Sequence, residues 1–430
     1  MLHPFSLNTL AMHRHLATLT LPLLACILLL SGCRQPTAPA SQTSLPALYA
    51  TDHSAISARQ LETMGRQLFF EPALSASGLQ SCASCHSPAQ AYGPPDGKDT
   101  QPGGIDGKQA GNRAVPSLRY LQTVPPFSEH FHDNDGNDSE DAGPTGGLTW
   151  DGRAASLHEQ ASLPLFAANE MANTSQAQLI RRLQASPSAK AFAALFGRDI
   201  FQNSPQAFAR LVLALEAFQQ SPPDFYPYSS KYDDWLRGKA VLSRQELRGL
   251  QAFNDPAKGN CASCHLSERQ ADGTFPAFSD FGLIALGVPR NRQLAVNFKQ
   301  EYHDMGLCGP LRVDMPKPEY CGLFRTPSLR NVASRKVFFH NGSFHDLRQV
   351  LEFYASRDST PSKWYPRDKQ GRIMLFDDLP LSYHGNVNRE PPFGGKPGSP
   401  PAFSARDVDD MLAFLRTLND ADVLPAKASR

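Results

Sequence analysis

The stretch CASCH occurs twice in this chain, at residues 82–86 and again at residues 261–265. Each copy places two cysteines three positions apart and a histidine directly after the second cysteine. This spacing is typical of covalent attachment of haem c, because both thiols reach the porphyrin vinyl groups while the next imidazole reaches the iron. We therefore predict two covalent haem c groups. The predicted attachment residues are Cys82, Cys85 and the proximal ligand His86, and Cys261, Cys264 and the proximal ligand His265.

A zinc or redox site is the alternative that one such motif would leave open. No further Cys or His stands at zinc-knuckle spacing, which favours haem in both places. Of the eight cysteines, only Cys308 and Cys321 lie outside these motifs and the N-terminal segment. In an exported protein this pair could close a short loop as a disulfide, which would contribute about 3 kcal/mol. Two free thiols are the alternative.

The N-terminus has the pattern of an export signal. The apolar run 19–30 is shorter than the ~20 residues that a transmembrane helix needs, and it ends at Leu-Ser-Gly-Cys33. This resembles a bacterial lipoprotein signal, so we predict a signal peptide over 1–32, a lipid anchor on Cys33 and a flexible tether over 33–50. An ordinary secretory signal is the alternative. Both place the protein in the periplasm or cell envelope, and Arg34 favours the outer membrane because it is not an inner-membrane retention signal.

Composition excludes several functional classes. The 430 residues carry a net charge of +1 with 19% charged residues, which does not suggest a nucleic-acid-binding surface or an acidic tail. The 36 prolines exceed the usual share of about 5% and indicate long ordered loops between helices.

The two halves of the chain repeat one another. Residues 115–119 (VPSLR) correspond to 326–330 (TPSLR), and residues 150–152 (WDG) correspond to 340–342 (HNG). Together with the two CASCH motifs, these pairs predict an internal duplication with one haem in each half.

We predict a mostly α protein built from two cytochrome c-like helical domains. The first domain covers 51–230 and the second domain covers 231–420, followed by a tail over 421–430. Strand-like alternation is scarce. Helical spacing of apolar residues predicts helices after Ser204 (Phe208, Leu211, Leu215, Phe218), after Ser243 (Leu247, Leu250, Phe253), over 344–355, and after Ser404 (Val408, Met411, Leu412, Leu415, Leu418).

The register of this duplication predicts an asymmetry between the haems. Tyr354 lies fourteen residues after His340, and Pro164 lies fourteen residues after Trp150. If the halves fold alike, both positions face their haem from the distal side. A phenol can ligate iron and proline cannot, so we predict an open five-coordinate first haem and a second haem closed by Tyr354. The alternative for Tyr354 is an aromatic side chain packed in the core.

The order of motifs resembles the bacterial di-haem cytochrome c peroxidase family over nearly all the mature chain. The resemblance rests on MGRQLFF (64–70), the CASCH motifs, WDGR (150–153), FRTPSLRN (324–331) and FHNG (339–342). It implies that hydrogen peroxide reacts at the first haem, in a distal pocket of Gln160, Pro164 and Glu170, with Trp150 between the haems. Glu170 would move a proton and Gln160 would orient the bound oxygen. Taken alone, Glu170 would be read as a surface carboxylate and Trp150 as a core residue.

In two differences from ordinary members, the chain resembles the MauG branch of that family. Tyr354 stands where ordinary members have Met, and the displaceable distal His of many members is missing. The sequence after Arg357 resembles that of MbnH-type enzymes. This branch implies oxidation of Trp or Tyr on a partner protein through a high-valent di-haem state. Gly259 and Asn260 stand where MauG has a Trp used for electron transfer, so we do not expect an identical electron route. A peroxidase fed by a small cytochrome c or cupredoxin is the main alternative, and an electron carrier or haem sensor without peroxide chemistry is another.

The resemblance also implies one calcium ion between the halves. The corresponding positions are Asn112 for a side-chain ligand and Arg335 and Val337 for backbone carbonyls. The acidic run 133–138 also invites a calcium site, but it lacks the closing Glu of an EF-hand loop, so a solvated loop is favoured.

Overall fold

The computed structural model describes residues 56–132 and 141–423. The predicted signal peptide (1–32), the tether (33–50) and the acidic run (133–138) lie outside the described residues, as does most of the predicted tail. Within the described parts, no helix is both long and apolar enough to span a membrane.

The described chain is mostly helical, as the sequence predicts, with long loops between the helices. Two short antiparallel ladders are its sheets: β1 (Pro102–Gly103) pairs with β2 (Gln109–Ala110), and β3 (Leu283–Ile284) pairs with β4 (Phe324–Arg325). The α-helices are α1 (Ala58–Phe69), α2 (Cys82–Cys85), α3 (Leu157–Phe166), α4 (Gln176–Gln184), α5 (Ala189–Phe196), α6 (Ser204–Gln219), α7 (Pro222–Phe225), α8 (Lys231–Leu236), α9 (Arg244–Asn254), α10 (Leu347–Ser356) and α11 (Ala405–Arg416).

Helices α6, α9 and α11 confirm the predicted helical segments. Capping boxes of Ser243 and Ser404 start α9 and α11. Two details differ from the prediction. Leu247 is exposed, because α9 buries Gly249, Ala252 and Phe253 instead. Helix α10 starts at Leu347 rather than at 344, since the backbone of Phe344 is engaged in a bridge to Phe338.

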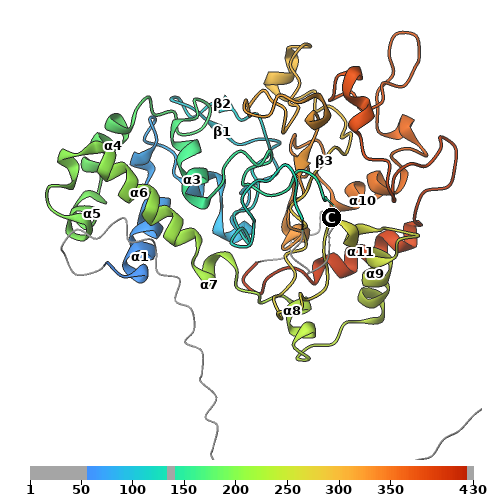
Figure 1. Ribbon diagram of the computed structural model, residues 1–430, viewed down its shortest axis with the longest axis horizontal. Coiled ribbons are helices and arrows are strands. Elements are labelled where there is room, and N and C mark those ends of the chain that lie inside the picture. Colours follow the sequence, from blue (N-terminus) through green and yellow to red (C-terminus); the bar gives the residue numbers. More distant parts are fainter. Residues whose placement is uncertain (1–55, 133–140, 424–430) are drawn as a thin grey trace, which may run out of the picture. The chain divides into compact units, whose positions relative to one another are not determined.

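Two hydrophobic cores are separate in sequence. One consists of buried residues between Met64 and Phe225 and surrounds α1, α4 and α6. The other consists of buried residues between Tyr232 and Leu418 and surrounds α9, α10 and α11. Figure 1 shows the corresponding grouping of the helices, with α1 and α3 to α6 in one group and α8 to α11 in the other.

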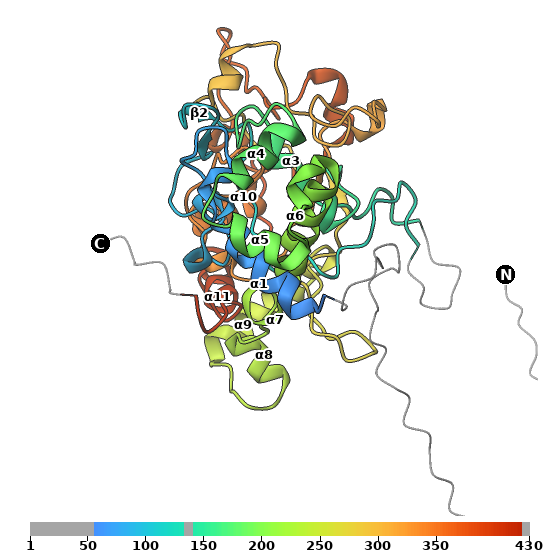
Figure 2. The ribbon, with the colours of Figure 1, turned by 90° about the vertical axis from the view of Figure 1, so that its left-hand side faces the viewer.

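Each core contains one closely packed helix pair that crosses at a glycine. A Cβ on Gly65 of α1 would lie 1.8 Å from the Ala214 carbonyl oxygen of α6, and a Cβ on Gly249 of α9 would lie 2.0 Å from the Asp410 carbonyl oxygen of α11. Only glycine permits this approach. The pairs α1 with α6 and α9 with α11 remain side by side in both views (Figures 1 and 2).

The loops that precede α3 and α10 also have matching conformations. Leu148 bridges to Ala154 before α3, as Phe338 bridges to Phe344 before α10. Each loop then places a residue in the left-handed region directly before the WDG or HNG segment, namely Thr149 (φ 73°) and Phe339 (φ 63°). Helices α3 and α10 therefore begin at equivalent positions relative to these two loops.

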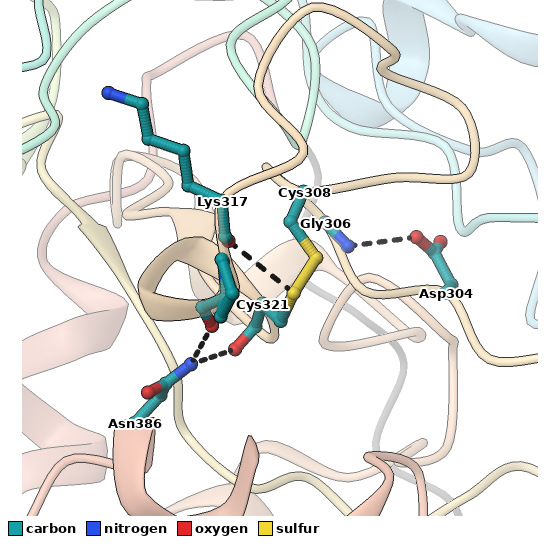
Figure 3. Close-up of a disulfide and its surroundings, with 7 residues drawn as sticks. Asp304, Gly306, Cys308, Lys317, Cys321 and Asn386 are labelled. Carbon is teal, nitrogen blue, oxygen red and sulfur yellow. Dashed lines mark hydrogen bonds between the residues drawn. A yellow bond between two sulfur atoms is a disulfide. The ribbon is translucent and has the colours of Figure 1, made fainter. Parts of the chain in front are cut away.

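Cys308 and Cys321 form a disulfide, which confirms the bonded alternative (Figure 3). The bridge closes a loop of the second half and packs within a small cluster that includes Leu307, Tyr320 and Leu323.

Candidate active site

Helix α2 places the first motif. The His86 imidazole Nδ1 lies 3.0 Å from the Tyr92 carbonyl oxygen, which can only accept, so Nδ1 carries the proton. Burial lowers the pKa of His86 to about 4. The imidazole is therefore neutral, and its Nε2 lone pair is free for a metal, as in proximal iron ligands.

The second motif repeats this arrangement. His265 Nδ1 lies 2.9 Å from the Phe278 carbonyl oxygen, and burial lowers its pKa. None of the four motif cysteines is part of a disulfide, and burial raises the pKa of Cys85 and of Cys264 to about 11.

Helix α3 carries two of the predicted distal residues of the first motif. Gln160 is half-buried, and its side-chain Oε1 is buried without a hydrogen-bond partner. Such an orphaned acceptor indicates a missing ligand, because buried polar atoms are normally satisfied. Pro164 stands one turn further along the helix and offers no side-chain donor or acceptor.

The turn after α3 positions the third distal residue, Glu170. The Met171 amide donates to the Pro164 carbonyl oxygen (3.1 Å) and folds the turn back onto the helix. The Glu170 side chain is exposed, yet the surrounding protein desolvates it and raises its pKa, with Arg153 acting in the opposite direction. Its charge also acts on Cys85, which places the carboxylate beside the first motif.

Trp150 reaches from the first half toward the second motif. Its indole Nε1 donates to the Ala114 carbonyl oxygen (2.8 Å), and its own carbonyl oxygen accepts from the Arg325 amide (2.8 Å). The side chain lines the cavity that contains Cys261 and His265. Trp150 therefore lies where the two halves meet, and the core interpretation alone does not account for this position.

A charged network fixes the backbone beside Trp150. The Arg113 guanidinium binds Asp151 (2.8 Å) and, across the two halves, Asp304 (2.6 Å). Burial of Asp151 raises its pKa, but Arg113 and Arg153 reverse this effect and hold the pKa at about 2. Sequence reasoning missed this network, because its members are far apart in the chain and no local pattern joins them.

The cavity around the second motif has a volume of about 560 Å³, within the usual range for cofactor pockets. The structure brings Tyr354 of α10 into its lining, together with Cys261, Cys264 and His265. Burial raises the pKa of Tyr354, and the two neighbouring thiols add to this effect. The ring also packs 5.2 Å from that of Phe393, so it has aromatic contacts as well as access to the cavity.

The same cavity contains a buried cation that forms no ion pair within the described parts of the chain. Arg325 Nε donates to the Thr149 carbonyl oxygen (3.1 Å), but its Nη1 has no partner among the described residues. Burial alone lowers the pKa of Arg325 to about 10. A haem propionate is the type of anion that such a guanidinium binds, so this pocket fits haem c. The sequence offered one signal, the position of Arg325 within the FRTPSLRN segment.

The three residues predicted for calcium stay a prediction, but the side chain of Arg335 reaches one of the carbonyl oxygens concerned. Arg335 donates from Nε to the Val337 carbonyl oxygen (3.3 Å) and from Nη2 to the Val115 carbonyl oxygen (3.0 Å). Asn112 is half-buried directly before Arg113. Among the described residues there is no group of three or more His, Cys, Asp or Glu side chains that could hold a metal. The calcium alternative at 133–138 lies outside the described residues.

Comparisons with known proteins match this chain to di-haem proteins, as the two CASCH motifs predict. The family model of the di-haem cytochrome c peroxidases matches residues 59–241. Methylamine utilization protein MauG of Paracoccus denitrificans is 35% identical over 400 residues, which cover 90% of this chain and 95% of that protein. The diheme peroxidase BthA of Burkholderia thailandensis is 38% identical with a TM-score of 0.76, covering 87% of this chain and 92% of that chain. A MauG-like protein associated with microbial copper homeostasis is 25% identical with a TM-score of 0.59, covering 89% and 96%.

These similarities extend over both halves of the chain. The chain belongs to the di-haem cytochrome c peroxidase/MauG family, and it is an oxidoreductase. Membership of a di-haem family implies two haem c groups, in accordance with the two CASCH motifs.

Proposed function

We propose that this enzyme reacts with hydrogen peroxide at an open first haem and oxidises Trp or Tyr residues of a partner protein. The observation that carries the proposal is the difference between two equivalent helices. Pro164 of α3 and Tyr354 of α10 are both the eighth residue of a ten-residue helix that leaves a matching loop. Only the second provides an atom that can ligate iron.

The matching loops, the paired helix crossings and the two histidine contacts support a duplicated architecture with one covalent haem in each half. We place the halves at 51–230 and 231–420. In each half the motif cysteines would hold the porphyrin, and His86 or His265 would be the proximal ligand. Arg325 would neutralise a propionate at the second site. Bound haem c supplies reduction of peroxide and one-electron oxidation of a donor.

Glu170 would take a proton from the oxygen of peroxide nearest the iron and return it to the leaving oxygen. Its raised pKa suits this role, because a general base works best when its pKa lies near the operating pH. Gln160 would hold the oxygen in place through its amide, whose Oε1 has no other partner. Trp150 would connect the two sites electronically, since it belongs to one half and lines the cavity of the other.

A second candidate is a peroxidase that reduces hydrogen peroxide to water with electrons from a small cytochrome c or cupredoxin. The similarity to BthA, which is named a diheme peroxidase, favours it. Both candidates share the first site and differ in where the electrons come from.

The predicted signal peptide and Cys33 support location in the periplasm or cell envelope, with a lipid anchor in the outer membrane as the only membrane contact. We expect no nucleic-acid partner.

Mixing the diferric holoprotein with one equivalent of hydrogen peroxide tests the proposal. We expect a rapid spectral change, followed by a long-lived oxidised form that decays when an oxidisable partner is added. Fast steady turnover with reduced cytochrome c and no modified protein product would favour the peroxidase. No rapid change at all would overturn both and leave an electron carrier.

A further inference from the structure

Arg335 occupies an unusual position between the two halves. Its side chain donates to a carbonyl oxygen of the first half, at Val115 (3.0 Å), and to a carbonyl oxygen of the second half, at Val337 (3.3 Å). The Ala114 amide also donates to the His340 carbonyl oxygen (2.7 Å), so a backbone hydrogen bond joins the two chain segments at this point. The guanidinium therefore bridges backbone acceptors that belong to different halves.

Within residues 56–132 and 141–423, the charge of Arg335 has no carboxylate partner. Burial is the single cause that lowers its pKa to about 10. Arg113, only a few residues before Val115, instead binds two aspartates. Arg335 also lines the cavity of the second motif, and its charge acts on His86 of the first. It is thus a fixed cation that lies close to both sites.

We propose that the Arg335 guanidinium is the cation that joins the two halves, in the place where the family resemblance implies calcium. Calcium takes six to eight oxygen ligands at 2.3–2.6 Å. Here the Val337 carbonyl oxygen, one of the implied ligands, is already engaged by a guanidinium donor. A guanidinium has five donors in a planar fork, so its Nε and Nη2 can donate to two carbonyl oxygens at the same time. The holoenzyme consequently needs no calcium to keep its halves in register.

The first test measures metal in the wild-type holoprotein. The full-length protein with both haems is equilibrated with calcium, desalted and analysed by mass spectrometry for metals, and its melting temperature and visible spectrum are recorded with and without EGTA. We expect far less than one calcium per chain and no shift on chelation. One tightly held calcium per chain, with a change in spectrum or melting temperature after its removal, would overturn the proposal. This arm does not depend on the proposed function.

The second test removes the cation. Arg335→Ala and Arg335→Gln should lower the melting temperature of the holoprotein by several degrees, with the larger loss in the alanine variant. Lys336→Ala is the matched control, because Lys336 is the exposed neighbouring cation. If Arg335→Ala melts like Lys336→Ala, the guanidinium does not join the halves. If the alanine variant yields no holoprotein, Arg335→Gln and the wild-type calcium content decide the question.

Discussion

The two halves of this enzyme share several structural features but differ in the side chains that these features carry. Each has a helix pair crossing at glycine, a motif histidine hydrogen-bonded to a carbonyl oxygen, and a ten-residue helix with the predicted distal residues. The side chains on these two helices differ. In the first half Pro164 and Gln160 stand on the helix, and in the second half the equivalent positions carry Tyr354 and Val350.

This difference teaches that equivalent backbone geometry can carry side chains of opposite chemistry. The first half has Gln160, whose Oε1 has no partner among the described residues, where the second has Val350, and it has Pro164 where the second has the phenol of Tyr354. The following changes test the comparison, beginning with the largest expected effect.

Tyr354→Phe should make the second pocket resemble the first. Without the phenol oxygen the second haem loses its proposed ligand, so we expect that the long-lived oxidised form no longer accumulates after one equivalent of peroxide. Stopped-flow absorbance spectroscopy measures this. Tyr383→Phe, a partly buried tyrosine of the same half, is the control and should behave like wild type. A Tyr354→Phe variant with an unchanged oxidised form would refute the ligand assignment.

Glu170→Gln should slow the reaction of the first site with peroxide by about 10²–10⁴-fold, the range for loss of a general acid–base group. The raised pKa of Glu170 also predicts a pH dependence. Because the carboxylate form accepts the proton, the wild-type rate should rise with pH through an inflection above the ordinary value of 4.5, and the Gln variant should lack it.

Glu159→Gln is the control for this experiment, since Glu159 is an exposed carboxylate of α3, the helix that precedes the turn with Glu170. Equal rates in the Glu170 and Glu159 variants across pH would exclude Glu170 as the proton carrier.

Replacing Cys308 and Cys321 together by Ser should reduce the free energy of unfolding by about 3 kcal/mol, because the disulfide closes a loop of roughly fifteen residues. The bridge belongs to the second half, so the reaction of the first site with peroxide should change little. Urea denaturation followed by circular dichroism measures the stability. Unchanged stability in the double variant would show that this loop is held by its packing.

Gln160→Val copies the residue that the second half has at the equivalent position. One hydrogen bond contributes about 0.5–1.5 kcal/mol, so the peroxide rate should fall by no more than about tenfold. Rapid-mixing kinetics at fixed pH check this. Gln178→Val, on the neighbouring helix α4, controls for the loss of an amide, and equal effects of both changes would remove Gln160 from the distal pocket.

The sequence predicted the features that depend on local patterns. CASCH spacing located both motifs, capping boxes located α9 and α11, and the repeat register placed Tyr354 in the second cavity. The sequence could not predict Leu247 as exposed, since the crossing at Gly249 turns a different face of α9 inward.

Local sequence patterns also could not predict contacts between segments that are far apart in the chain. The Arg113 network and the bridge made by Arg335 join residues about 40 to 220 positions apart, and only the folded chain brings them together. The sequence predicts a role only for the backbone carbonyl of Arg335, and no local pattern indicates that its side chain contacts carbonyl oxygens of both halves.

Low-temperature electron paramagnetic resonance of the resting diferric holoenzyme tests the central claim most directly, because it counts the two spin states of ferric iron. We predict one high-spin centre, from the first site beneath Pro164, and one low-spin centre, from the second site closed by Tyr354. Two low-spin centres, or two high-spin centres, would contradict the asymmetry from which the proposed function is argued.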